Sequence, residues 1–87
     1  MTLAEAFGQV LRGLPEERGW SQERLAFASA RTRNYVGALE RGERSPTLVV
    51  LIDVAYGLKM EPAEIVARVA AVAPPTTPRR HPSRRSG

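Results

Sequence analysis

The chain contains no cysteine, only one histidine and a single lysine among its 87 residues. The absence of cysteine excludes disulfides, thiolate nucleophiles and thiolate metal ligands, and it fits a reducing cytoplasm. The histidine, His81, lies among prolines and arginines near the end of the chain, where no serine–histidine–aspartate relay or histidine metal site can form around it. We therefore expect no enzyme activity, no metal and no cofactor.

Long apolar runs are also missing. One of the longest, TLVVLI at residues 47–52, is far shorter than the roughly 20 residues that cross a bilayer. The first ten residues have neither a basic start nor a continuous apolar stretch, so they do not resemble a secretory signal. These features predict a cytoplasmic protein without membrane contact, and nothing in the sequence implies a small-molecule ligand.

What is present divides into an amphipathic part and a basic tail. Residues 1–73 hold nine basic and nine acidic side chains, so the net charge of +4 comes from four arginines that follow. Residues 74–87 have no large aliphatic side chain and cannot bury enough surface to fold. We predict one domain over 1–73 and a disordered basic tail over 74–87, whose arginines either follow phosphates or only keep the chain soluble.

Apolar spacing and capping residues predict an all-α fold, a compact bundle of five helices. The first helix begins at Leu3 and should end or kink near Leu14, because Pro15 lacks the N–H that would continue it. A fourth should begin with Ser45 as N-cap and Pro46 at the first helical position. The expected inward face of this helix is Leu48, Leu51, Ile52 and Ala55, and the apolar side of a fifth helix that starts at Pro62 is Ile65, Val66, Val69 and Val72.

Two short helices with a tight turn between them lie in the middle of the chain, in the outline of a helix-turn-helix. The earlier one spans about residues 22–29, with Ser21 as its N-cap. The later one spans residues 33–41, with Thr32 as N-cap and Gly42 where a left-handed residue is wanted.

Positive charge is concentrated around these two helices. Residues 18–44 carry six arginines against three glutamates on an otherwise neutral domain, a footprint typical of contact with nucleic acid. We expect Phe7, Trp20 and Tyr56 in the core, because aromatic residues that stack on single strands would lie together on one exposed surface.

The third predicted helix has two long polar side chains and then two very small residues on its outward face. Arginine can fork onto the O6 and N7 atoms of guanine and asparagine onto the N6 and N7 atoms of adenine, each pair contributing about 1–3 kcal/mol of discrimination. The small residues would let the helix lie deep in a major groove, although a merely solvated face is the alternative. The outward residues are Arg33, Asn34, Gly37 and Ala38, and the inward ones are Val36, Leu39 and part of Tyr35.

The run WSQERLAFASARTRNYVGALERGERSPTLVVLIDVAYGL, residues 20–58, resembles the helix-turn-helix of the phage repressor and Cro family, also called the XRE family. Its segment TRNYVGALERGERSP looks closest to small controller proteins and repressors of that group. The resemblance covers about residues 5–66. It implies a five-helix, lambda repressor-like domain that regulates transcription by binding operator DNA, usually as a dimer.

The resemblance also implies roles for single residues. Glu40 would be structural and held by an arginine of the second helix, for which Arg24 is the candidate. Base contacts fall on Arg33, Asn34 and Ala38, and phosphate contacts fall on Gln22, Thr32, Tyr35, Arg41 and Arg44.

The turn departs from the family pattern at two positions. Where the family has a glycine and then an apolar residue, this chain has Ala30 and Arg31. An alanine in the left-handed conformation costs roughly 1 kcal/mol, and Arg31 must direct its charged end outwards.

The fifth predicted helix carries valines beyond what the core needs, and Val66, Val69 and Val72 are therefore our candidates for a dimer surface. The sequence thus predicts a sequence-specific transcriptional regulator that binds double-stranded DNA as a homodimer. The alternative is a protein-interaction module, an antitoxin or adaptor, that uses the same fold to bind a protein partner.

Overall fold

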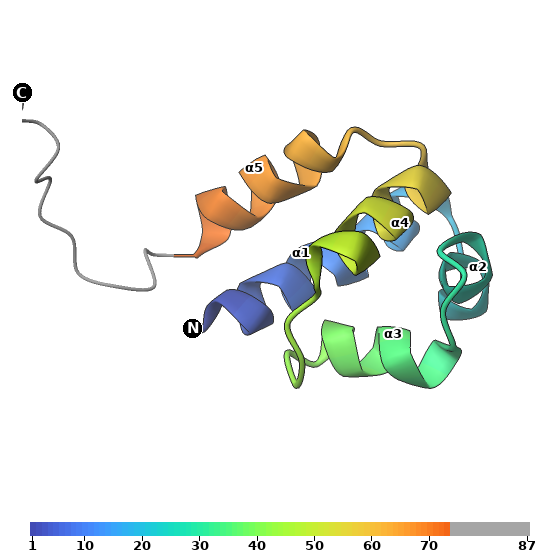
Figure 1. Ribbon diagram of the computed structural model, residues 1–87, viewed down its shortest axis with the longest axis horizontal. Helices are drawn as coiled ribbons and strands as arrows, with labels where there is room; N and C mark the ends of the chain where they lie inside the picture. The colour runs from blue at the N-terminus through green and yellow to red at the C-terminus, as the bar shows by residue number, and fades with distance from the viewer. Residues whose placement is uncertain (74–87) are drawn as a thin grey trace, which may run out of the picture.

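The computed structural model describes residues 1–73, which form five α-helices and no strand (Figure 1). The helices are α1 (Leu3–Arg18), α2 (Gln22–Ala28), α3 (Arg33–Glu40), α4 (Leu48–Leu58) and α5 (Pro62–Val72). The predicted all-α, five-helix fold is confirmed. The predicted basic tail over 74–87 lies outside the described residues.

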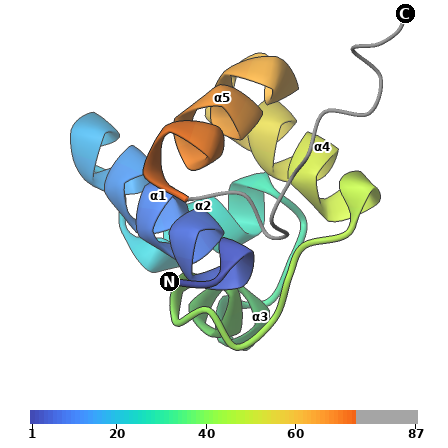
Figure 2. The same ribbon diagram turned by 90° about the vertical axis from the view of Figure 1, so that its left-hand side faces the viewer.

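The five helices pack around one apolar core. α1 contacts α3 and α5, α2 contacts α3 and α4, and α4 contacts α5. α3 lies at the lower edge of the molecule in Figures 1 and 2, and no other described helix lies beyond it. The core comprises Ala6, Phe7, Leu11, Leu14, Leu25, Ala26, Val36, Leu39, Val50, Val54, Ala55, Leu58, Ile65 and Val69.

α1 continues through Pro15 to Arg18, so the helix does not end near Leu14, which was one of the two predicted outcomes. The proline removes one backbone hydrogen bond, but Leu14 and Pro15 are both buried, and their burial offsets that loss. The helix ends instead at Gly19, whose φ is 69° and whose N–H donates to the carbonyl of Glu16 over 3.1 Å.

α4 begins two residues later than predicted. Its N-cap is Thr47, whose hydroxyl accepts from the N–H of Val50 over 3.2 Å, whereas Ser45 and Pro46 precede the helix. The buried face also differs from the predicted one, because the packing of α4 against α2 and α5 decides which side of the helix turns inward. Leu48, which we expected in the core, is 71% exposed. Leu51 and Ile52 are half-buried, and the fully packed positions are Val50, Val54, Ala55 and Leu58.

The aromatic residues divide between core and surface. Phe7 is buried as predicted, and Trp20 is half-buried against the core. Tyr56 is 76% exposed, so its predicted core position is wrong. On α4 the buried positions are Val50, Val54, Ala55 and Leu58, and Tyr56 is not among them.

α5 starts at Pro62 as predicted. Ile65 and Val69 are buried, whereas Val66 and Val72 remain 51% and 38% exposed. No helix within residues 1–73 combines the length and the apolar character needed to cross a membrane.

Candidate nucleic-acid interface

Side-chain caps start both helices of the central motif, as predicted. The Ser21 hydroxyl accepts from the N–H of Arg24 over 3.1 Å, and the Thr32 hydroxyl accepts from the N–H of Tyr35 over 3.1 Å. Gly42, which follows α3, has a φ of 75°, in the left-handed region we expected. These caps fix where α2 and α3 begin and which side chains form their first turns.

The turn between α2 and α3 is built from the two residues that depart from the family pattern. Ala30 has a φ of 59°, so an alanine does occupy the left-handed position. Arg31 is half-buried and its guanidinium pairs with Asp53 of α4, with 2.7 Å between Nη2 and Oδ2. This partly buried pair ties the turn to α4.

α3 is held by its inward face and by a close backbone contact with α1. Val36 and Leu39 are fully buried. Gly8 of α1 lies so near α3 that a Cβ at this position would be 2.5 Å from the carbonyl oxygen of Leu39. In addition, Arg12 of α1 donates to the carbonyl oxygen of Glu40 over 3.1 Å. These contacts set how far α3 stands out from the domain.

The outward face of α3 begins with two exposed polar side chains, Arg33 and Asn34. Nε of Arg33 lies 3.1 Å from Oε2 of Glu23 on α2. Ala38 is half-buried, and the guanidinium of Arg41 covers Gly37 closely enough that a Cβ there would meet Nη1 at 3.1 Å. The side chains of Arg33 and Asn34 are therefore open to solvent, whereas Gly37 and Ala38, which follow them on α3, are partly covered.

The expected phosphate contacts lie around this face, and several already have partners within the chain. Thr32 is exposed at the cap, and Tyr35 is half-buried with the Arg44 guanidinium over its ring at 5.3 Å. Arg41 pairs with Glu43, with 2.8 Å between Nε and Oε2. Gln22 is half-buried and donates its amide to a carboxylate oxygen of Glu40.

Glu40 is structural, but its expected partner is wrong. The carboxylate is held by Gln22, whereas Arg24 lies over the ring of Trp20, 4.4 Å from its centroid. Burial raises the pKa of Glu40, against the opposing positive charge of Arg12. The second carboxylate oxygen has no hydrogen-bond partner within the described part of the chain. The choice between Gln22 and Arg24 depends on rotamers that sequence spacing does not reveal.

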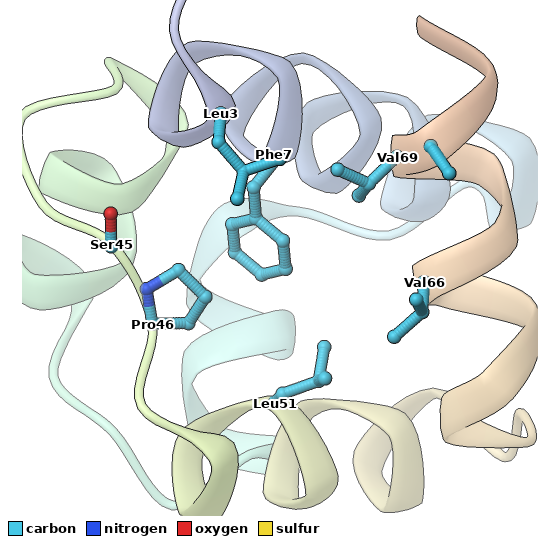
Figure 3. Close-up of a pocket in the computed structure, with 8 residues that line it drawn as sticks. Leu3, Phe7, Ser45, Pro46, Leu51, Val66 and Val69 are labelled. Carbon is cyan, nitrogen blue, oxygen red and sulfur yellow. The ribbon is translucent and has the colours of Figure 1, made fainter. Parts of the chain in front are cut away.

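A separate apolar groove lies between α1, the segment before α4, α4 and α5 (Figure 3). It has a volume of about 240 Å³. Two of the three predicted dimer residues, Val66 and Val69, line it, and Val72 does not. The full lining is Leu3, Phe7, Ser45, Pro46, Leu51, Val66, Val69 and Ala70. Because α3 contributes none of these residues, the groove and the outward face of α3 are distinct surfaces.

The sequence pattern missed three residues that shape the interface. Glu23 pairs with Arg33, Gly8 allows α3 to approach α1, and Arg12 binds the end of α3. For Gly8, the only sign in the sequence was a glycine inside the predicted first helix, a position where a residue with a side chain would normally be favoured. Within residues 1–73, no three histidine, aspartate or glutamate side chains converge to hold a metal ion.

Comparison with known proteins identifies the family of the domain. A family model described as a helix-turn-helix domain matches residues 6–68. The HTH-type transcriptional regulator SutR of Escherichia coli is 40% identical over 58 residues, which are 67% of this chain and 33% of that regulator. The chain thus corresponds to about a third of the length of that relative.

Solved structures agree. The restriction-modification controller protein C.AhdI from Aeromonas hydrophila is 47% identical, with a TM-score of 0.69 over 71% of this chain and 94% of that one. The clp gene regulator ClgR from Corynebacterium glutamicum is 29% identical, with a TM-score of 0.77 over 83% of this chain and 94% of that one. The resemblance drawn from residues 20–58 is thereby confirmed. The chain belongs to the XRE-type family of helix-turn-helix transcriptional regulators, which bind DNA and are not enzymes.

Proposed function

We propose that this regulator recognises a specific operator by placing α3 in the major groove of double-stranded DNA. The observation that carries the proposal is the division of α3 into two faces. Val36 and Leu39 are fully buried against the domain, whereas Arg33 and Asn34 of the first turn are exposed. A helix anchored on one side and open on the other can enter a groove about 12 Å wide without rearrangement of its supports.

Base reading in this proposal falls to three residues. The Arg33 guanidinium is suited to guanine and the Asn34 amide to adenine, because each matches the donor and acceptor pattern of that base edge. Ala38 offers a methyl group, which can contact the methyl of thymine. The chemistry of the outward face thus favours a mixed sequence and not a simple run of one base.

Phosphate contacts would flank the base contacts and fix the position of α3 on the duplex. Gln22 uses one amide hydrogen for Glu40 and keeps a second for a phosphate oxygen. Thr32, Tyr35 and Arg44 lie beside the same helix, and Arg41 would have to exchange its carboxylate partner for a phosphate.

The proposed active form is a homodimer on an inverted repeat, with the two α3 helices about 34–36 Å apart. The apolar groove, with half-exposed Val66 at its edge, supports a second copy as its occupant. Val69 is buried and would form the floor of the groove. Val72 is partly exposed and would extend the dimer surface along α5. The same groove would serve equally well for the second candidate function, an antitoxin or adaptor that binds a different protein there.

The experiment is selection of random-sequence duplexes by the purified protein at near-physiological salt, followed by binding measurements on the enriched sequence. Arg33→Ala should lose discrimination at one base pair by about 1–3 kcal/mol. Arg68→Ala is the matched control, because it removes an arginine of α5, outside the helix-turn-helix, that pairs with Glu17 and Glu64. An enriched inverted repeat supports the homodimer. A protein that enriches no motif would point to the protein-binding alternative.

A further inference from the structure

Glu23 brings a carboxylate to the surface that also carries Arg33. Glu23 is the second residue of α2 and Arg33 is the first residue of α3. Their side chains are 68% and 58% exposed, and Nε of Arg33 lies 3.1 Å from Oε2 of Glu23. The pair therefore links α2 to the N-terminal end of α3. This is the end of α3 that carries the proposed base contacts.

Glu23 lies in the first turn of α2, where its charge favours the helix dipole, but neither that role nor general DNA affinity requires its contact with Arg33. An ion pair this exposed contributes little to stability, because water and salt screen it. A carboxylate beside the proposed reading helix also repels the phosphates of any duplex, whatever its sequence. What Glu23 can change is the conformation of Arg33.

The geometry of the pair suits base reading. The closest contact of Glu23 is with Nε of Arg33, and within residues 1–73 no hydrogen bond uses the two terminal nitrogens of this guanidinium, which are available to donate. Guanine presents O6 and N7 to such a fork. A long side chain that is already restrained also loses less conformational freedom when it docks.

We propose that Glu23 is a specificity-determining residue that acts through Arg33, by holding its terminal nitrogens towards guanine. The inference rests on the proposed function, because it requires Arg33 to contact a base. Glu23 itself is a positioning residue and touches no base. It lowers affinity for all duplexes and raises the preference for the correct one.

The test compares Glu23→Ala with Glu43→Ala. Each variant removes one negative charge and the partner of one exposed arginine, since Nε of Arg41 lies 2.8 Å from Oε2 of Glu43. Dissociation constants are measured by fluorescence anisotropy for the selected operator and for a duplex changed at the base pair that Arg33→Ala relaxes. Glu23→Ala should reduce the ratio of the two constants by roughly two- to twelvefold, the equivalent of immobilising one long side chain. Glu43→Ala should shift both constants by the same factor.

Three results would overturn the inference. Glu23→Ala could shift both constants equally, which would mean that Glu23 acts only by its charge. It could relax a different base pair, which would mean that Glu23 reads a base directly. It could also reduce the ratio further when Arg33 is already alanine, which would mean that it does not act through that arginine. Failure of the proposed function would be seen separately, as a wild-type protein that prefers no duplex or an Arg33→Ala variant with unchanged ratios.

Discussion

Replacement of Gly8 by alanine should destabilise the protein, whereas the same replacement at Gly13 should stabilise it. Both glycines lie within α1, so the two variants form a matched pair. A Cβ at Gly8 would lie 2.5 Å from the carbonyl oxygen of Leu39 and 2.6 Å from that of Glu40, whereas a Cβ at Gly13 would meet nothing within 4 Å. Backbone atoms cannot turn aside as a flexible side chain can, so α3 itself would have to move.

The two substitutions should change the free energy of unfolding in opposite directions. Alanine is favoured over glycine in a helix interior by about 0.5–1 kcal/mol, and both variants gain this amount. Only Gly8→Ala also suffers overpacking, which typically costs about 1–3 kcal/mol. Subtracting the gain from the cost leaves a net loss of up to about 2.5 kcal/mol at Gly8, against a gain of about 0.5–1 kcal/mol at Gly13.

Thermal and urea denaturation followed by far-ultraviolet circular dichroism measure the difference. In a domain of this size, each 1 kcal/mol shifts Tm by about 4–8 °C, so the two variants should melt on opposite sides of the wild type. Equal stabilisation by both substitutions would refute the close approach of α1 and α3. A displaced α3 should also weaken operator binding by Gly8→Ala, whereas Gly13→Ala should bind normally.

Three further outcomes follow from single contacts. Thr47→Ala should cost about 1 kcal/mol because it removes the α4 cap, whereas Ser45→Ala should change the free energy of unfolding by less than about 0.5 kcal/mol; equal losses in urea denaturation would contradict the observed cap. Burial raises the pKa of Glu40 above 4.5, so the folded state holds its proton more tightly than the unfolded state. The free energy of unfolding of the wild type, relative to that of Glu40→Gln, should therefore be greatest below that pH and fall towards neutrality. Urea denaturation that gives the same difference between the two proteins at acidic and neutral pH would contradict the raised pKa. Val66→Asp, at the edge of the groove, should shift sedimentation towards the monomer, whereas Ala67→Asp, exposed on the same helix, should not; an unchanged mass for Val66→Asp would remove the groove from the interface.

The sequence predicted the elements that depend on local chemistry. Ser21, Thr32 and Gly42 lie where their side chain or backbone freedom is needed within one turn of a helix, so their positions follow from neighbouring residues alone. The burial of Val36 and Leu39 and the exposure of Arg33 follow from the helical period of α3 in the same way.

The errors arose where two local choices were comparable and packing decided between them. Ser45 and Thr47 are both good caps, and it is the Thr47 hydroxyl that accepts from the first turn of α4, from the N–H of Val50. Pro15 usually ends a helix, but here it is buried against the core together with Leu14. The partner of Glu40 depended on side-chain rotamers, which place Gln22 at the carboxylate and Arg24 over Trp20, and no spacing within one helix reveals them.

The pairing of arginines with carboxylates changes what the local charge of residues 18–44 means for binding. Arg31, Arg33 and Arg41 each lie within ion-pair distance of a carboxylate. To bind a phosphate, such an arginine must exchange one anion for another, so its net gain is small. A base edge is neutral and needs only the guanidinium hydrogens that the pair leaves free. The carboxylates therefore weaken attraction to every duplex more than they weaken the reading of bases. We accordingly expect discrimination by this domain to rest on α3 and not on the density of its arginines.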